Sequence, residues 1–268
     1  MSKLDIKNPL YVSLISIGIS IIAIALSIYN YIQISEIREK SNILHSLQFV
    51  DLPEITEDSI VYGNGTDIII FEYSELLCPY CARFFIYTFP EIKEKYLDTG
   101  IAKYVFKNFI IHGELAERLA SYAICIYKEK GYEEYHNYKS FIFEELYDVA
   151  FISRNLTKFQ SKIDEILEKY RDLEFCANQN KILSLINKDT YEAINIYKFS
   201  GTPSFLIAIS MNRVTDEKIK MIKDILDSLK PYGFLYNMWI SKDRKYLLIG
   251  FSGALPIEFF DSLLSPFI

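Results

Sequence analysis

The chain has 268 residues, of which 50% are hydrophobic and 24% charged, which is enough for one sizeable core and a smaller helical part. Its formal net charge of −6 argues against nucleic acid as the partner, because binding to phosphates requires a basic surface. Cysteine is used sparingly, with 4 in the chain.

The first distinct element is an uncharged hydrophobic segment from Leu10 to Ile32. It has about the length that crosses a hydrocarbon core of roughly 30 Å. Lys3 and Lys7 precede it, and no small-residue cleavage pattern follows it. The pattern predicts an uncleaved signal anchor, with residues 1–32 forming a cytosolic tip and a single transmembrane helix and the remaining chain outside the cytoplasm. A cleaved signal peptide is the alternative.

A stalk and the first part of a folded domain are expected next. Residues 33–59 are polar to mixed and indicate the stalk, whereas Asp67–Ser74 is an apolar, β-branched and aromatic run typical of a buried strand. Apolar residues recur at helical spacing from Pro79 to Leu97, and residues 101–111 again have strand character. Strand, helix and strand in this order predict a βαβ unit of a parallel sheet.

The middle of the chain is predominantly helical. Amphipathic segments at 114–130 and 132–147 are separated by Gly131, and two more follow at 155–170 and 178–198. These helices are expected to form a part of their own between the strands.

Strand character returns near the C-terminus. Residues 201–209 and 245–252 have the composition of strands, and residues 256–264 that of a closing helix. The segment between these strands, about 210–245, is longer than a hairpin requires. Its apolar patch, YGFLYNMWIS, could be an added strand, packed core or an exposed contact surface.

Two cysteines, Cys78 and Cys81, form a Cys-x-x-Cys motif between the predicted strand and helix. If Cys78 lies at the helix N-terminus, unpaired N–H groups and the helix dipole favour its thiolate, which is the nucleophilic form. Pro79 would then occupy the first helical position, where its missing N–H costs nothing. Cys81, one turn later, would be the more buried of the two.

A metal site and a hydrolase are poor alternatives. A zinc site would need a second close pair of ligands, but Cys125 and Cys176 are isolated and the histidines lack a ligand spacing. We therefore predict no metal and no cofactor. A Cys–His hydrolase built on Cys78 would leave Cys81 unexplained.

The stretches GNGTDIIIFEYSELLCPYC and YKFSGTPSFLI resemble the DsbA-like thiol–disulfide oxidoreductases, which have a thioredoxin fold with an inserted helical domain. The likeness runs in order from about Ile60 to Leu264, with 210–245 as the main departure. It implies an α/β thioredoxin-like fold with parts at 60–112 and 199–268 and an inserted helical domain at 113–198.

The resemblance also implies roles for the residues of the motif. Cys78 would be the exposed attacking cysteine and Cys81 the resolving one. Thr202 and Pro203 match the family's loop, in which a cis proline faces the disulfide and leaves a backbone edge for an extended substrate. An ordinary proline at the start of a strand is the alternative for Pro203.

Further residues near the motif match the family. Pro79 and Tyr80, between the cysteines, are expected to tune the thiolate and, with Thr202, to contact the substrate. Glu72, six residues before Cys78, resembles the buried acid that lies beneath the resolving cysteine and shuttles a proton. An acid paired with a lysine at a strand end is the alternative for Glu72.

A separate prediction concerns the other two cysteines of the chain. Cys125 and Cys176 fall at positions of the insert where several members of the resembled family carry a second disulfide. An oxidising exterior would favour this bridge, and two reduced, buried cysteines are the alternative.

The function implied is that of a membrane-anchored, extracytoplasmic dithiol oxidase that introduces disulfides into exported proteins through Cys78 and Cys81. Its partners would be thiol-containing exported proteins and a membrane redox partner of the DsbB or VKOR type, which would reoxidise it. A reductase or isomerase with the same chemistry and a non-catalytic binding module are the alternatives.

Overall fold

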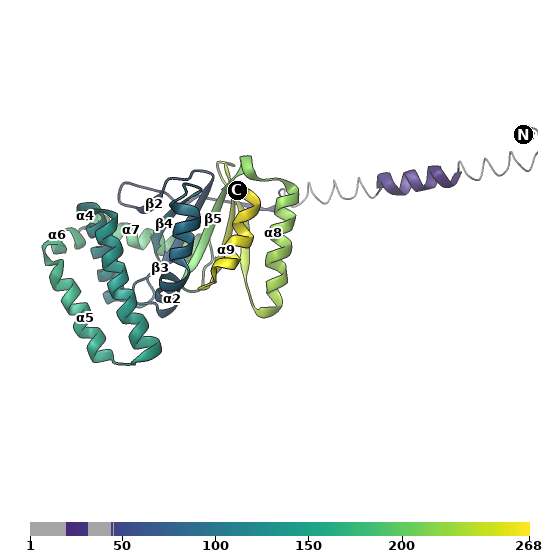
Figure 1. Ribbon diagram of the computed structural model, residues 1–268. Helices are drawn as coiled ribbons and strands as arrows, with labels where there is room; N and C mark the ends of the chain where they lie inside the picture. Colours follow the sequence, from purple (N-terminus) through teal and green to yellow (C-terminus); the bar gives the residue numbers. More distant parts are fainter. Residues whose placement is uncertain (1–19, 32–43, 45) are drawn as a thin grey trace, which may run out of the picture. The chain divides into compact units, whose positions relative to one another are not determined.

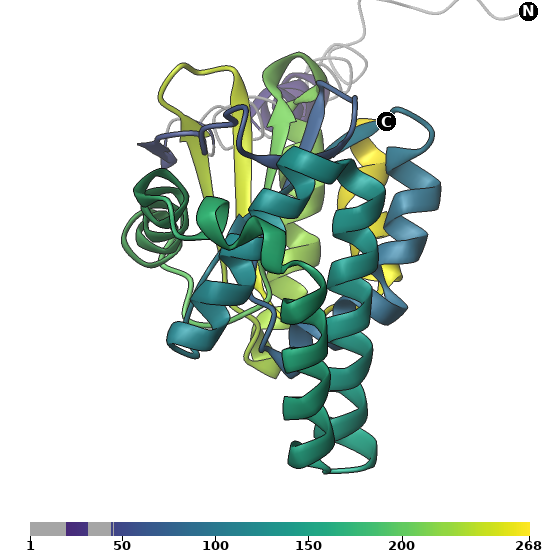
Figure 2. The same ribbon diagram turned by 90° about the vertical axis from the view of Figure 1, so that its left-hand side faces the viewer.

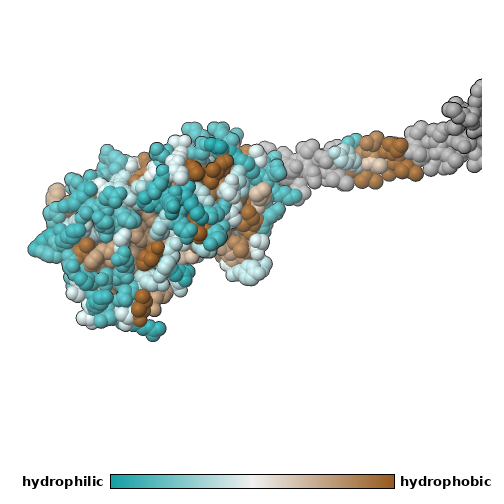
Figure 3. All heavy atoms as spheres, viewed as in Figure 1, coloured by the Kyte–Doolittle hydropathy of each residue, from teal (hydrophilic) through white to brown (hydrophobic). Residues whose placement is uncertain are grey.

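The computed structural model describes residues 20–31, 44 and 46–268. The chain divides into two compact units, 1–46 and 47–268. In the first unit, residues 20–31 are helical, and Figure 3 shows hydrophobic residues over much of this segment. The other residues of the expected transmembrane segment, 10–19 and 32, lie outside the described residues. Among the residues that are described, no helix is both long enough and apolar enough to cross a bilayer.

The second unit is built on a mixed sheet. Its strands are β1 (Gln48–Val50), β2 (Ile60–Gly63), β3 (Ile68–Ser74), β4 (Ala102–Asn108), β5 (Ser204–Ser210), β6 (Tyr236–Ser241) and β7 (Tyr246–Ser252). Within the described residues they form a seven-stranded sheet in the order β1-β6-β7-β5-β3-β4-β2. β3 and β4 are parallel, whereas β5 pairs antiparallel with both β3 and β7. The expected strands at 67–74, 101–111, 201–209 and 245–252 are confirmed as β3, β4, β5 and β7.

Helices flank this sheet (Figure 1). They are α2 (Pro79–Tyr87), α3 (Phe89–Ile92), α4 (Glu114–Tyr147), α5 (Leu156–Lys169), α6 (Glu174–Ala177), α7 (Asn180–Tyr191), α8 (Asp216–Leu229) and α9 (Ile257–Leu264). π-Helical turns continue three of them, namely η1 (Lys93–Leu97), η2 (Asp148–Ile152) and η4 (Glu192–Ile196). Short 3₁₀ turns lie at Arg171–Leu173, Met211–Arg213, Lys230–Tyr232 and Ser265–Phe267. The chain order β3, α2, α3, β4 gives the predicted βαβ unit.

β3 is buried along its whole length, as its apolar composition predicts for a central strand. Successive side chains of a strand point to opposite faces. Phe71 and Tyr73 therefore belong to the core cluster with Tyr197, which follows η4. Glu72, between them, points to the other face, where the Phe205 ring of β5 packs on Phe84 of α2. This alternation places one acidic side chain directly under α2, the helix that begins at Pro79 within the Cys-x-x-Cys motif.

The helical insert comprises α4 to α7 and lies between β4 and β5. Figure 2 shows the second half of α4 and α5 running side by side. The two amphipathic segments expected at 114–130 and 132–147 are the two halves of α4. They meet at Gly131, whose φ of 84° lies in the left-handed region that favours glycine. The sequence thus predicted both the helices and the position of the break.

One expectation about the sheet needs correction, and one alternative that the sequence left open is decided. Residues 47–59, assigned to a stalk, belong to the folded unit, because β1 pairs in parallel with β6 and Asp58 is buried. The apolar patch at 232–241 supplies β6, an added strand that also pairs with β7. Trp239 of β6 is buried against Gly250 of β7, where the Cβ atom of any larger residue would approach the indole to 2.7 Å. β6 can therefore pack closely on β7 only because residue 250 is glycine, which leaves room for the Trp239 indole.

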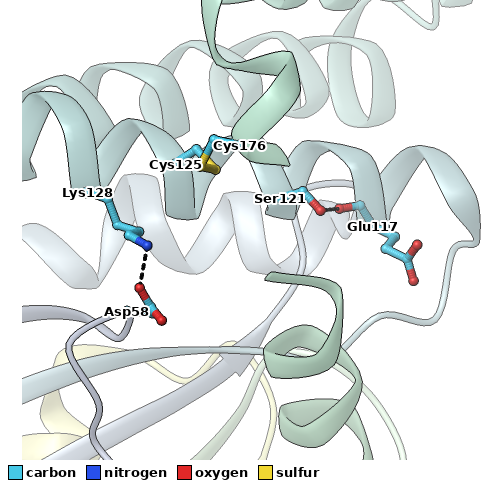
Figure 4. The surroundings of a disulfide bond; sticks show 6 residues. All are labelled: Asp58, Glu117, Ser121, Cys125, Lys128 and Cys176. Carbon is cyan, nitrogen blue, oxygen red and sulfur yellow. Dashed lines mark hydrogen bonds and ion pairs between the residues drawn. A yellow bond between two sulfur atoms is a disulfide. The ribbon is translucent and has the colours of Figure 1, made fainter. Parts of the chain in front are cut away.

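Cys125 of α4 and Cys176 of α6 form a disulfide, which confirms the expected bridge (Figure 4). It joins positions 51 residues apart, with Cα atoms separated by 6.0 Å. One turn after Cys125, Lys128 forms an ion pair of 2.6 Å with the buried Asp58. The disulfide ties the helices of the insert together, while the ion pair holds α4 to the segment before β2.

We expect the double substitution of Cys125 and Cys176 by alanine to lower the free energy of unfolding by about 4 kcal/mol, because the bridge restricts a long loop of the unfolded chain. Urea denaturation followed by circular dichroism measures this difference. Wild-type protein denatured with a strong reductant should show a comparable loss. A loss below about 1 kcal/mol in both cases would contradict the prediction.

Candidate functional site

Cys78 is the N-cap residue of α2, and its sulfur accepts a hydrogen bond of 3.2 Å from the N–H of Cys81. Pro79 occupies the first helical position, as the sequence predicted, and the first turn carries no acidic side chain. β3 ends at Ser74, and the N–H of Cys78 donates to the carbonyl of Glu75 in the intervening loop. The end of β3 therefore sets the position at which α2 begins. At the N-terminus of α2, backbone N–H groups point towards the sulfur of Cys78.

The two thiols of the motif have different acidities. A hydrogen bond from the Cys81 side chain is the largest influence on Cys78 and lowers its pKa to about 7, against burial, which raises it. The Thr202 side chain and the backbone N–H groups of Cys81 and Tyr80 act in the same direction. Burial raises the pKa of Cys81 well above its usual range, and Cys78 and Glu72 add to this effect. Cys78 is thus the sulfur that ionises near neutral pH.

The Thr202–Pro203 peptide bond is cis, as the sequence predicted. The Cys78 thiol donates a hydrogen bond of 3.3 Å to the carbonyl oxygen of Thr202. The loop that contains Thr202 and Pro203 therefore lies against the Cys78 sulfur. Cys78 is 3% exposed, and the expectation of an exposed attacking cysteine is wrong in this dithiol form. The contact with Thr202 contributes to this burial, and a substrate must approach along the edge of the loop.

Glu72 lies beneath Cys78 and Cys81 and is completely buried. Its Oε2 accepts hydrogen bonds of 3.2 Å from the hydroxyl of Tyr104 and from the ammonium of Lys139. Glu72 is therefore a buried acid beneath the cysteines, as the resemblance implies, and it is also paired with a lysine, although it lies within β3 and not at a strand end.

Lys139 belongs to this site although the sequence reasoning missed it. It comes from the second half of α4, in the helical insert, and only 4% of its side chain is exposed. It lies on the buried stripe formed by Tyr135, Ile142 and Phe143. A lysine within the apolar stripe of an amphipathic helix was the available signal, because burial of an unpaired charge is costly and implies a partner.

Glu75 has a structural contact that the sequence did not predict. Its buried carboxylate accepts hydrogen bonds from the N–H groups of Ile111 and His112, at 2.9 and 3.1 Å, and contacts the His112 ring. The loop that contains Cys78 is thereby tied to the segment that leads from β4 into α4. Glu75 connects the dithiol loop with the start of the insert.

The surface beside the motif is aromatic. Tyr80 is 54% exposed, with the Arg83 guanidinium 5.3 Å from its ring centroid. Phe151, from η2 at the far end of α4, lies edge-on to Tyr80 with ring centroids 6.2 Å apart. The expected substrate-contacting position of Tyr80 is thus accessible, and the insert borders it.

Within the described residues, no cluster of three or more histidine, cysteine or acidic side chains has an arrangement that could hold a metal ion. Cys125 and Cys176 are bonded to each other. The free thiols of the chain are those of Cys78 and Cys81.

A family model described as Thioredoxin matches residues 56–227, which is more than half of the chain. The chain belongs to the thioredoxin family. This thioredoxin-family chain is 27% identical over 166 residues to a protein of Rickettsia conorii and 29% identical over 159 residues to one of Rickettsia felis. Both are provisionally named protein-disulfide oxidoreductases. Each alignment covers 58% of this chain and 54% of the relative, so the chain spans about half the length of these curated relatives.

Solved structures agree on the fold of this thioredoxin-family member. The crystal structure of Wolbachia pipientis alpha-DsbA1 is similar with a TM-score of 0.53 and 21% identity, over 81% of this chain and 92% of that one. A single-substitution variant of it gives a TM-score of 0.55 at 22% identity, with the same coverage. The predicted thioredoxin-like fold with a helical insertion is confirmed.

We expect the alkylation rate of Cys78 by iodoacetamide to rise with pH and to be half-maximal near pH 7, because the thiolate is the reactive form. Mass spectrometry of the reduced protein at a series of pH values measures the rate at this residue. In the Cys81→Ala variant the midpoint should move to higher pH, since the largest influence that lowers the pKa of Cys78 is removed. A midpoint that stays in place in this variant would contradict the assignment.

Proposed function

We propose that the chain is a membrane-anchored, extracytoplasmic thiol–disulfide oxidoreductase that acts mainly as a dithiol oxidase on exported proteins. One observation carries the chemistry: Cys78 caps α2, has a pKa lowered to about 7 and lies against the cis Thr202–Pro203 loop, with the more buried Cys81 one turn away. Such an arrangement supplies a nucleophilic thiolate and a partner that closes a disulfide with it.

In the oxidising direction, a substrate thiolate attacks the sulfur of Cys78 in the Cys78–Cys81 disulfide. The bond between the two cysteines breaks, its electron pair passes to Cys81, and a mixed disulfide forms between Cys78 and the substrate. A second substrate thiolate then attacks the substrate sulfur and releases Cys78 as a thiolate. The substrate gains a disulfide, and the enzyme is left as the dithiol.

Substrate binding is proposed at the edge of the Thr202–Pro203 loop. An extended substrate segment could pair with this backbone, as in strand addition to a sheet edge, and contact Pro79 and the exposed Tyr80. These contacts would orient the substrate sulfur towards Cys78.

The proposed location rests on the N-terminal segment. The uncharged run from Leu10 to Ile32 and the preceding Lys3 and Lys7 support a single-pass anchor with the redox domain outside the cytoplasm. The Cys125–Cys176 disulfide is compatible with an oxidising compartment. Continued turnover there would require reoxidation of the Cys78 and Cys81 thiols by a membrane partner of the DsbB or VKOR type.

A reductase or isomerase is the second candidate, and a specific observation favours it. A pKa of about 7 for Cys78 lies near the value of about 7 typical of thioredoxin and above the value of about 3.5 found in strongly oxidising DsbA. A less stabilised thiolate gives a less oxidising disulfide, so this feature favours the reducing direction.

Replacement of Cys78 by serine should abolish oxidation of a reduced dithiol peptide, because the mixed disulfide forms at this sulfur. The rate is measured by peptide mass with the oxidised protein in excess. The Cys125→Ala/Cys176→Ala variant, which keeps the redox pair, should retain activity at a temperature at which it remains folded. Activity in the Cys78→Ser variant would rule out the proposal and favour a non-catalytic binding module.

The equilibrium redox potential decides the direction of the reaction. Equilibration of Cys78 and Cys81 with glutathione buffers, read by mass after alkylation, should give a potential nearer to about −120 mV than to about −270 mV for an oxidase. A value close to about −270 mV would reject the oxidase and support the reductase.

A further inference from the structure

The turn that joins η2 to α5 exposes a run of apolar side chains, and we call its residues 151–156 the insert tip. Phe151, Ile152 and Leu156 are 44%, 69% and 73% exposed. Figure 2 shows this turn at the lower end of the hairpin of α4 and α5, where the two helices project beyond the sheet. The exchange steps described above do not use these side chains. A contiguous group of exposed apolar residues of this kind marks a contact surface.

The polar groups of the insert tip are bonded within the tip and its flanking helices. The Ser153 hydroxyl donates to the Asp148 carboxylate at 2.8 Å and accepts from the N–H of Asn155 at 3.3 Å. The N–H of Ser153 donates to the Asp148 carbonyl at 2.7 Å. Asn155 caps α5, since its side chain accepts from the N–H of Lys158 at 2.9 Å. Because an unbonded polar group is costly away from water, this bonding lets the tip enter an apolar medium at low cost.

The charges at the insert tip suit the surface of a bilayer. Lys158 pairs with Asp148 at 3.3 Å and with Glu145 at 3.4 Å, which offsets part of the negative charge next to the tip. Arg154, between the apolar side chains, is exposed and forms no ion pair with any residue that the structure describes. A guanidinium binds phosphate oxygens in a bidentate manner, and its long side chain reaches from an inserted backbone to the headgroups. A lipid phosphate is therefore a fitting partner for Arg154.

Tyrosine rings lie between the insert tip and the dithiol. The rings of Phe151 and Tyr147 have centroids 4.9 Å apart, and Tyr147 lies 5.5 Å from Tyr87 of α2. Phe151 also contacts Tyr80, and both Tyr80 and Tyr87 are more than half exposed. Tyrosine is enriched where a bilayer meets water, because its ring is apolar and its hydroxyl stays hydrated. Apolar tip, arginine and tyrosine rings thus follow the order of acyl chains, phosphates and hydrated interface.

Two features favour a lipid surface over a protein as the partner of the insert tip. The tip is convex, because every residue from 151 to 158 is exposed. A fluid bilayer conforms to such a projection, whereas a protein partner would need a complementary concave site. In addition, residues 33–46 join the proposed anchor to the folded unit, and a chain of this length spans at most about 50 Å in any conformation. An anchored chain would therefore present the tip to its own bilayer at a high effective concentration.

We propose that the insert tip docks into the bilayer that carries the anchor, with Phe151, Ile152 and Leu156 among the outer acyl chains and Arg154 at the phosphates. This inference rests on the proposed function, because that function places the chain at a membrane. The contact between Phe151 and Tyr80 joins the tip to the dithiol surface. Docking therefore holds the Cys78 end of the redox domain close to the bilayer, where a membrane partner has to reoxidise it.

The test uses the full-length protein in vesicles of phosphatidylcholine with a minority of phosphatidylglycerol, prepared with or without bromine on the acyl chains. Bromine quenches a tryptophan that enters the acyl-chain region. Ile152→Trp places this probe in the insert tip. Phe175→Trp is the matched control, because Phe175 is 83% exposed and lies on α6, beyond the other end of α5. Trp239, the one tryptophan of the wild type, is buried and gives both variants the same background.

The emission of Ile152→Trp should fall about twofold in brominated vesicles, because interfacial segments enter the acyl boundary by roughly 5–10 Å. Phe175→Trp should be quenched no more than wild type, which controls for the affinity of tryptophan itself for lipid. Addition of Phe151→Ser and Leu156→Ser to Ile152→Trp should return the quenching to the level of Phe175→Trp, because the neighbouring apolar side chains are lost.

The role of the arginine is tested in the same assay. Arg154→Glu, added to Ile152→Trp, should lower the ratio of docked to undocked tips at least about fivefold, because the phosphates repel a carboxylate. Arg171→Glu makes the same change of charge beyond the other end of α5, at an exposed residue paired with Glu168. This second control should leave the quenching of Ile152→Trp in place.

Quenching of Ile152→Trp no greater than that of Phe175→Trp would overturn the proposal. A reduced, unfolded substrate protein that shifts the Ile152→Trp emission when brominated lipid does not would likewise overturn it and identify a protein as the partner. Resistance of the wild type to extraction from vesicles at alkaline pH scores the anchor separately. Extraction would refute the anchor of the proposed function, while the quenching still decides whether the insert tip enters lipid.

Discussion

The hydrogen bond from the N–H of Cys81 to the sulfur of Cys78 is the interaction on which the site depends. It makes Cys78 the cap of α2, so the helix can begin only where the loop after β3 delivers this residue. The Cys81 side chain, from the same turn, is the largest influence that lowers the pKa of Cys78, and the capping N–H adds to it, whereas burial raises the pKa of Cys81. One helical turn therefore carries two chemically different sulfurs.

Both the thioredoxin part of the fold and the helical insert contribute residues to the site. The thioredoxin part contributes Cys78, Glu72 and the cis Thr202–Pro203 bond, which three different segments bring together. The helical insert contributes Lys139, whose ammonium forms an ion pair with Glu72. Through the contacts of Glu75 with the segment at 111–112, the dithiol loop is also tied to the start of the insert. A change in the packing of α4 would therefore alter the surroundings of the Cys78 and Cys81 sulfurs.

Burial has opposite effects on the charged groups of this site. It raises the pKa of Cys81 and lowers that of Lys139, and in each case the neutral form is favoured. For Cys78, hydrogen bonds outweigh burial, so the anion is favoured. The redox direction depends on this balance, because stabilisation of the Cys78 thiolate stabilises the reduced state and makes the disulfide more oxidising.

The sequence alone determined the features that depend on local periodicity and on residue type. The run of apolar residues before Cys78 predicted β3, the amphipathic spacing with Gly131 predicted both halves of α4, and Pro79 after Cys78 predicted the helix start. The resemblance to DsbA-like proteins added the cis bond before Pro203 and the disulfide of the insert. All of these are set within a few residues or by a matched motif.

Only the tertiary structure decided the contacts between distant residues. Lys139 and Glu72 are 67 positions apart, and β1 joins β6 across most of the chain, so no local pattern specifies either pairing. The burial of Cys78 likewise depends on Thr202, 124 positions away. Such contacts arise when helices and strands pack to exclude water, and their partners are selected by the shape and charge of the assembled core rather than by their sequence neighbours.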